Sequence, residues 1–150
     1  MSPRAKYVPG AAAERIAPAS LPTVAGMVQD ARRLLGSRGE EVAARHLRRR
    51  GFEIVERNYR TRWGELDLIA FDGDTLVFCE VKTVRLAPGG VRPFDSLHGR
   101  KRTKVRRMAR QWLSARGERQ YVPQLRFDAI GVTFDTQGDL AELVHLEGAF

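Results

Sequence analysis

The sequence is poor in cysteine, in acidic residues relative to basic ones, and in long apolar runs. Its single cysteine, Cys79, excludes an internal disulfide, and no cluster of Cys and His residues supports a zinc site. No run of about 18 apolar residues occurs, so we expect no transmembrane helix. Glu14 and several prolines interrupt the N-terminal region, which is atypical of a secretory signal. These absences predict a soluble protein of a reducing, cytoplasmic compartment.

The charge balance of the chain is strongly basic. Among 150 residues, 26 Lys and Arg face 18 Asp and Glu, which leaves a net charge of +8. A surface of this kind attracts nucleic acid, an anionic membrane or an acidic protein. The 43% share of hydrophobic residues is ordinary for a globular protein, and the length fits a single core. The composition therefore predicts one globular domain with a polyanionic partner.

The pattern along the chain divides it into an arm and a domain. Residues 1–29 are rich in Ala and Pro without sustained periodicity, so we expect a flexible arm before a domain over 30–150. Residues 58–63 read as a polar, basic connection. The α-β-β-β-α-β-β order predicts an α/β fold with a mixed sheet of about five strands flanked by helices. The expected elements are a helix over 30–50, strands over 52–56, 65–71 and 75–84, a helix over 100–116, and strands over 126–134 and 140–146.

Three ionisable residues lie inside two of these apolar strands. Glu80 and Lys82 share one strand face by alternation, and the turn over 72–74 brings Asp67 opposite positions 78–80. Two carboxylates suit Mg²⁺ or Mn²⁺, and the carbonyl of Val81 is a further oxygen ligand. Lys82 is then placed to orient or deprotonate an attacking water. The alternative is a pair of salt bridges, Asp67 with Lys82 and Glu80 with an arginine, and the pattern alone leaves both open.

A third carboxylate, Glu40, lies at the edge of the apolar stripe of the first helix. Gly36 and Gly39 precede it and remove bulk where a helix approaches a sheet closely. From that edge Glu40 is placed to add a ligand to the metal or its water. The alternative is a surface glutamate paired with Arg33 or another arginine.

Basic residues are concentrated in the second predicted helix and around Trp63. Positions 100–110 hold seven Lys and Arg residues and no acid, which is unfavourable unless phosphates are nearby. Arginine beside an aromatic ring is suited to grip a nucleic-acid backbone. The residues expected to contact phosphates are Arg60, Arg62, Lys101, Lys104 and Arg107.

Five segments in order resemble the YraN family, a poorly characterised bacterial family. That family is similar to the PD-(D/E)xK nuclease superfamily and to archaeal Holliday-junction resolvases. Leu66 stands where the superfamily has its name-giving proline, which is not a ligand. The resemblance spans about residues 31–150 and rests on Gly36-Ser37-Arg38-Gly39-Glu40, Asn58-Tyr59-Arg60, Gly64-Glu65-Leu66-Asp67-Leu68-Ile69, Phe78-Cys79-Glu80-Val81-Lys82 and Arg126-Phe127-Asp128.

The resemblance implies a restriction-endonuclease-like core with a metal-dependent active site. It implies that Asp67 and Glu80 hold Mg²⁺ or Mn²⁺, that Lys82 is the catalytic lysine, and that Glu40 is the helix-borne acidic residue of the site. The implied activity is endonucleolytic cleavage of DNA, including branched or structured DNA. By analogy with the resolvases it also implies a homodimer.

Two other functions stay open at this stage. One is a nucleic-acid-binding module that keeps the nuclease fold without cutting. The other is an accessory protein whose basic helix docks an acidic partner. A membrane partner is not expected.

Overall fold

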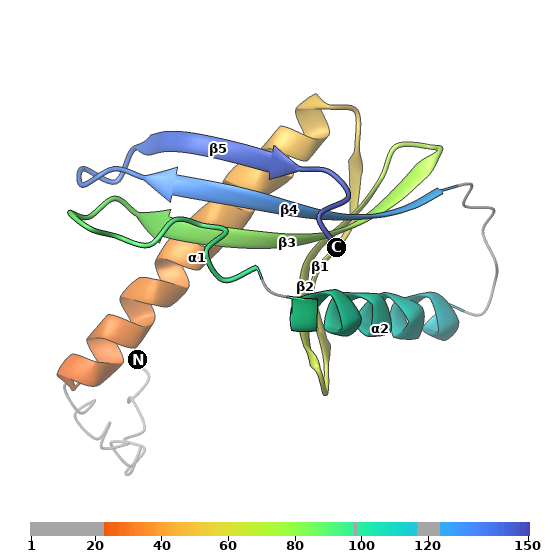
Figure 1. Ribbon diagram of the computed structural model, residues 1–150, viewed down its shortest axis with the longest axis horizontal. Coiled ribbons are helices and arrows are strands. Elements are labelled where there is room, and N and C mark those ends of the chain that lie inside the picture. Colours follow the sequence, from red (N-terminus) through yellow and green to blue (C-terminus); the bar gives the residue numbers. More distant parts are fainter. Residues whose placement is uncertain (1–22, 98, 117–123) are drawn as a thin grey trace, which may run out of the picture.

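The computed structural model of the protein describes residues 23–97, 99–116 and 124–150, without the side chains of 99–101 (Figure 1). The observed order is the predicted α-β-β-β-α-β-β, which confirms the α/β class. The elements are α1 (Val24–Arg49), β1 (Glu53–Thr61), β2 (Gly64–Phe71), β3 (Thr75–Arg85), α2 (Gly99–Ala115), β4 (Gln124–Phe134) and β5 (Leu140–Leu146).

The five strands form one mixed sheet in the order β1-β2-β3-β4-β5. The β3–β4 pair is parallel and the other three pairs are antiparallel. Parallel neighbours need a crossover connection, and the segment between β3 and β4 carries α2. Figure 1 shows α1 crossing the strands obliquely on one side of the sheet and α2 lying along its other side. The predicted mixed sheet flanked by helices is therefore confirmed.

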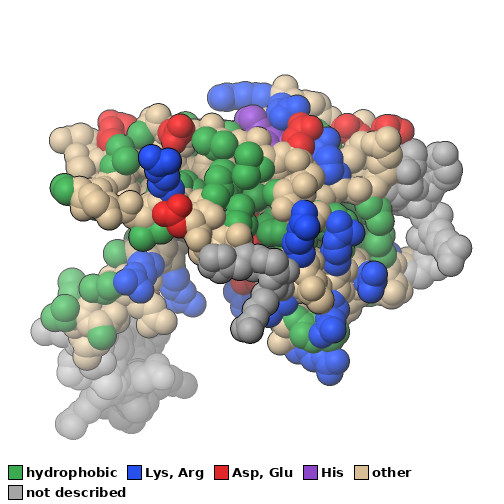
Figure 2. Space-filling model, viewed as in Figure 1, with side chains coloured by type: hydrophobic (Ala, Val, Ile, Leu, Met, Phe, Trp, Pro, Cys, Tyr) green, Lys and Arg blue, Asp and Glu red, His purple; other side chains and the backbone are tan. Residues whose placement is uncertain are grey.

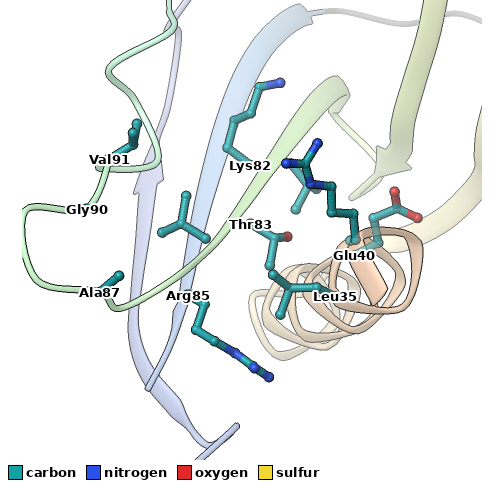
Figure 3. A pocket seen from close by; sticks show the side chains of 12 residues that line it. Leu35, Glu40, Lys82, Thr83, Arg85, Ala87, Gly90 and Val91 are labelled. Carbon is teal, nitrogen blue, oxygen red and sulfur yellow. The ribbon is translucent and has the colours of Figure 1, made fainter. Parts of the chain in front are cut away.

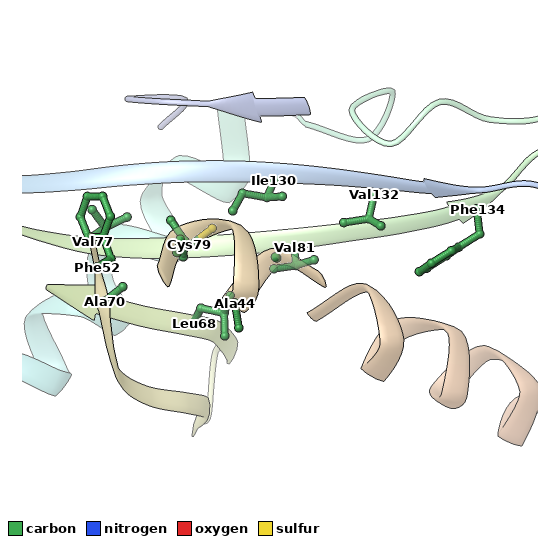
Figure 4. Packing of buried hydrophobic residues seen from close by; sticks show 12 residues of the cluster. Ala44, Phe52, Leu68, Ala70, Val77, Cys79, Val81, Ile130, Val132 and Phe134 are labelled. Carbon is green, nitrogen blue, oxygen red and sulfur yellow. The ribbon is translucent and has the colours of Figure 1, made fainter. Parts of the chain in front are cut away.

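Each helix buries its apolar side on its own face of the sheet. On the α1 side, Ala43, Ala44 and Leu47 pack against alternate residues of β2, β3 and β4 (Figure 4). On the α2 side, Val105, Met108 and Trp112 pack against the other set of strand residues, which includes Phe78 and Phe127. Cys79 lies fully buried in the α1-side cluster, as expected of a small core residue.

Two element boundaries differ from the prediction. The first helix begins at Val24, ahead of the expected start near Asp30, because the hydroxyl of Thr23 caps it by accepting a hydrogen bond from the Gly26 N–H (3.2 Å). The segment 58–63 is not a connection, because β1 continues to Thr61 before a tight turn. An edge strand tolerates such polar residues, since one side of it faces solvent. Residues 1–22 of the expected arm lie outside the described part of the chain.

Two glycines set how closely the layers approach. A Cβ added at Gly39 would overlap the side chain of Thr83, so α1 lies directly on β3 at this point. A Cβ added at Gly131 of β4 would lie 2.8 Å from Pro93 and 2.9 Å from Phe94, which belong to the loop after β3. These two contacts place α1 and the loop after β3 next to the last residues of β3. Neither described helix is long and apolar enough to cross a membrane.

Candidate active site

The site forms where β2 and β3 stop pairing. Their antiparallel register ends at Leu68 and Cys79, although both strands continue. The next positions along are Asp67 and Glu80. Here the Asp67 Oδ2 accepts a hydrogen bond from the Val81 N–H (2.7 Å), so a carboxylate replaces the missing strand partner. Asp67 and Glu80, which the sequence predicted to lie together, are thus next to one another where the hydrogen-bonded pairing of β2 with β3 ends.

Asp67 lies in an environment that disfavours its charged form. Burial first, and then the nearby carboxylates of Glu40, Glu80 and Glu65, raise the pKa of Asp67 to about 7, although the hydrogen bond from the Val81 N–H acts to lower it. Glu40 is therefore close enough to Asp67 for its charge to matter, as expected from the helix edge. The structure brings negative charge from α1, β2 and β3 to one place.

Asn58 connects two of these carboxylates and was given no role by sequence reasoning. With its amide nitrogen directed at them, Asn58 donates to Glu40 Oε2 (3.1 Å) and to Glu65 Oε1 (2.9 Å). Its φ of 53° lies in the left-handed region, which asparagine adopts more readily than most residues. The pKa of Glu40 is raised overall, mainly by burial. The hydrogen bond from Asn58 acts to lower it, the charge of Glu65 to raise it, and the charge of Arg57 to lower it.

The surface ion pair that the sequence offered as an alternative for Glu40 is formed by its neighbour Glu41. Glu41 accepts hydrogen bonds from Arg57 (2.8 Å) and Arg45 (3.4 Å). Among the described residues, Glu40 makes no such ion pair with Arg33 or another arginine. Glu41 therefore forms the arginine pairs, and Glu40 lies close to Asp67 instead.

Lys82 contacts the acidic cluster through its own strand. Its Nζ lies 3.1 Å from Glu80 Oε1, and both side chains are at least half-buried. A salt bridge thus exists, but it joins residues two positions apart on β3 instead of crossing from Lys82 to Asp67. The lysine thus compensates the charge of Glu80, which itself lies close enough to Asp67 to raise its pKa.

The donor set at this place suits a hard divalent cation. Within the described ranges, no group of three or more His, Cys, Asp or Glu side chains is gathered tightly enough to hold a metal ion on its own. Mg²⁺ is usually bound through one or two carboxylates and keeps waters or takes substrate phosphates for the rest. Asp67, Glu80 and the Val81 carbonyl supply only oxygen donors, so the chemistry of the residues fits Mg²⁺ or Mn²⁺.

A pocket of about 540 Å³ adjoins this cluster (Figure 3). It lies between α1, the end of β3 and the loop that follows β3. Glu40, Val81 and Lys82 belong to its wall, whereas Asp67 and Glu80 do not line it. The remaining lining residues are Arg32, Leu35, Gly36, Thr83, Val84, Arg85, Ala87, Gly90 and Val91.

The expected phosphate contacts form a basic surface over α2 and the β1–β2 turn. Figure 2 shows Lys and Arg side chains gathered over α2. The Arg62 and Arg107 guanidinium carbons lie 4.4 and 5.2 Å from the Trp63 ring centre, so both basic residues share one aromatic platform. Lys104 is exposed, and Arg60 is exposed with Glu65 3.8 Å away. The side chain of Lys101 lies outside the described residues.

The last of the family-like segments, over 126–128, was given no role by sequence reasoning and is a buried anchor. Asp128 is fully buried on β4 and accepts hydrogen bonds from Arg126 (2.9 Å) and from His145 Nε2 (2.8 Å). Because Arg50 donates to His145 Nδ1 (3.2 Å), the proton of His145 lies on Nε2, and the bond from His46 Nε2 (3.0 Å) must also be donated. This network ties β4, β5 and the end of α1 together, so its role is structural.

Comparison with known proteins gives one consistent family. The model of the uncharacterised protein family UPF0102 matches residues 39–132. A UPF0102 protein of Pelotomaculum thermopropionicum is 45% identical over 121 residues, covering 81% of this chain and 98% of the relative. One of Parafrankia sp. is 48% identical over 117 residues, covering 77% and 95%. One of Nocardia farcinica is 44% identical over 129 residues, covering 85% and 97%.

Proposed function

The chain belongs to the uncharacterised protein family UPF0102, the YraN family, and we propose that it is a metal-dependent nuclease that hydrolyses phosphodiester bonds in DNA. One observation carries the proposal. Asp67 is fixed by the Val81 N–H at the point where β2 and β3 stop pairing, beside Glu80, and the ammonium of Lys82 lies 3.1 Å from Glu80. Two carboxylates and a lysine at a strand opening suit phosphodiester hydrolysis.

Each side chain has a distinct role in this proposal. Asp67 and Glu80, with the Val81 carbonyl, would hold Mg²⁺ or Mn²⁺. The bound ion supplies charge stabilisation at a phosphoryl oxygen. Glu40, held by Asn58, accepts a hydrogen bond from the attacking water and supports the metal site. Lys82 orients that water and offsets the negative charge that develops on the phosphate.

DNA reaches this site across the basic surface on the α2 face. Leu76 and Phe78 face α2, and by alternation Glu80 and Lys82 continue on the same face of β3. Lys104, Arg107 and Arg62 are therefore available to hold phosphates on the side from which the lysine is presented. Such contacts are independent of sequence, which fits an enzyme that recognises DNA structure.

The test is cleavage of duplex, single-stranded, flap and four-way DNA in the presence of Mg²⁺ or Mn²⁺. We expect cleavage by the unaltered chain and its loss in Asp67→Asn and in Lys82→Ala. Asp74→Asn, an exposed carboxylate in the turn of the same hairpin, is the matched control and should retain activity. Cleavage that survives both Asp67→Asn and Lys82→Ala would come from a contaminant and would refute the proposal.

A second function is favoured by one specific contact. Lys82 and Glu80 neutralise one another in the absence of metal, so the site is also consistent with a nucleic-acid-binding module that does not cut. This alternative requires DNA binding that is unchanged by chelation of divalent ions and by Asp67→Asn. Metal-dependent cleavage by the purified chain excludes it.

A further inference from the structure

The pocket beside the candidate site draws its walls from three segments. Figure 3 shows Leu35 and Glu40 on the helix, Lys82, Thr83 and Arg85 on the strand, and the loop residues closing the opposite side. Glu40 and Lys82 are the groups assigned above to the chemistry. Asp67 and Glu80 do not line the pocket, so a ligand held in it lies next to the candidate metal ligands and not on them.

The walls of the pocket are held in place by contacts outside it. The loop over 86–97 is seated on β4 through Pro93 and Phe94 at Gly131, where no side chain would fit. A turn within the loop is closed by the Gly90 N–H donating to the Ala87 carbonyl (2.8 Å). On the other side, the close approach of α1 to β3 fixes the helix. The pocket is thus preformed, which lowers the cost of ordering on binding.

Two guanidinium groups on these walls have no counterion in the described part of the chain. Among the residues that the structure describes, no carboxylate lies within ion-pair distance of Arg32 or Arg85, and neither guanidinium donates a hydrogen bond. Nearby arginines differ, because Arg38 donates to the Gly138 carbonyl (2.6 Å) and Arg57 pairs with Glu41. Arg32 comes from α1 and Arg85 from the end of β3, so two separate elements place uncompensated positive charge around one pocket.

Apolar side chains line the same pocket as these charges. Leu35, Val84 and Val91 also line the pocket, and Val91 is 66% exposed. A pocket of about 540 Å³ is of the size that holds small ligands, and this volume is too small to enclose a paired double helix. Cationic and apolar groups together match one nucleotide, which has an anionic phosphate and an apolar base face.

We propose that this pocket binds one unstacked nucleotide of a single DNA strand, with Arg32 and Arg85 on its flanking phosphates and Leu35 and Val91 against its base. The proposal rests on the nuclease function above and narrows its substrate class. A strand can enter the pocket only where it is unpaired, so the substrate has single-stranded segments, such as a flap, an overhang or an open junction. Uninterrupted duplex meets only the α2 surface.

The test measures binding of a labelled oligothymidylate and of a duplex of equal length by fluorescence anisotropy, in a chelator so that no cleavage occurs. The variants are Arg32→Gln, Arg85→Gln and the double variant. Arg33→Gln is the matched control, because this exposed arginine is the next residue on α1, carries the same charge and lies outside the pocket.

We expect the double variant to weaken oligothymidylate binding by about tenfold and Arg33→Gln by no more than about twofold, because only the pocket arginines make charge-assisted hydrogen bonds to the strand. The salt dependence of log K should flatten by about 0.7 for each single-strand phosphate that the variant no longer neutralises. Duplex affinity should change no more in the double variant than in Arg33→Gln.

Either of two results overturns the proposal. One is equal loss of oligothymidylate affinity in the double variant and in Arg33→Gln. The other is a loss of duplex affinity as large as the loss for the single strand. These results leave the nuclease proposal intact if cleavage still depends on Asp67. Conversely, a selective loss of single-strand binding in a chain that never cuts supports the pocket and removes the nuclease function.

Discussion

At the scale of single residues, Asp128 is the clearest case of a buried carboxylate that is stabilised by its hydrogen-bond donors. It is fully buried and accepts hydrogen bonds from Arg126, His145 and the Gly148 N–H. Asp128→Asn keeps the shape but directs an amide donor at groups that are donors themselves. We expect a loss of unfolding free energy on the order of 3 kcal/mol in urea denaturation. Asp139→Asn, exposed in the β4–β5 turn, should change it by less than about 0.5 kcal/mol.

The same network makes stability depend on pH. Burial, then the charges of His145, Arg50 and Arg49, lower the pKa of His46 below 6.5. The unfolded chain therefore binds more protons between that lowered pKa and 6.5, so the free energy of unfolding falls as pH drops through this window. Burial acts to raise the pKa of Asp128, but its three donors outweigh burial and lower it below 3.8. The stabilisation that the Asp128 carboxylate contributes is present above pH 3.8 and is lost as the pH falls through its lowered pKa.

Urea titrations at a series of pH values check this dependence. The raised pKa of Asp67 acts in the opposite direction, because its protonation below about pH 7 favours the folded chain. The contribution of His46 is therefore the difference in unfolding free energy between the unaltered chain and His46→Gln, and we expect this difference to shift against the unaltered chain as the pH drops from about 7 towards 5. Glutamine at position 46 cannot titrate, whereas Asp128 is present in both proteins, so both should lose the contribution of Asp128 alike below about pH 4. A difference between the two proteins that does not change between pH 7 and 5 would contradict the assignment of His46 as a neutral, partly buried group.

Single residues also show how far sequence reasoning reaches into the site. Asp67, Glu80 and Lys82 were identifiable because charges inside apolar strands are costly and alternation fixes their faces. Asn58 was not, because its role depends on a left-handed φ and on β1 lying close to Glu40 of α1. Neither the left-handed φ nor the distance between β1 and α1 can be recognised from the sequence around Asn58. Whether Asp67 and Glu80 bind metal is still a prediction.

At the scale of elements, two glycines of α1 report on its contact with β3. Gly36 has no atom near an added Cβ, whereas an added Cβ at Gly39 would overlap Thr83. Gly36→Ala should therefore stabilise the fold by about 0.5–1 kcal/mol through helix propensity. Gly39→Ala should destabilise it by about 1–3 kcal/mol, because the helix must shift from the strand.

Thermal unfolding of the two alanine variants, each against the unaltered chain, measures this difference. Opposite signs are expected for the same chemical change on the same helix. If both substitutions stabilised the protein, α1 would not lie as close to β3 as the structure places it. Gly39→Ala should also impair the candidate site, since Glu40 is the next residue.

The order and type of the elements were predictable because apolar periodicity is strong in α2 and in the inner strands. The ends of α1 and β1 were not. The capping residue Thr23 lies in a stretch without periodicity, and β1 runs on through polar residues that an edge strand accepts. The end of β2–β3 pairing, which opens the site, depends on the competing bond from Val81 to Asp67 and has no sequence pattern of its own.

At the scale of the whole molecule, net charge and the local surface make separable contributions to DNA binding. The net charge of +8 attracts any polyanion at long range, whereas direct contacts release counterions one phosphate at a time. Lys104→Gln/Arg107→Gln removes two charges from α2. Arg48→Gln/Arg49→Gln removes two charges from the last turn of α1, on the opposite face of the sheet. The two variants have equal net charge.

If DNA lies on the α2 surface, only the first variant should flatten the slope of log K against log salt, by about 0.9 for each duplex phosphate that it no longer neutralises. Its affinity should fall alike for duplexes of different sequence, because phosphate contacts carry no sequence information. The second variant should keep the slope, since screened net charge acts without a fixed contact. Equal slopes in the two variants would mean that the +8 charge alone attracts DNA and that α2 is not its binding surface.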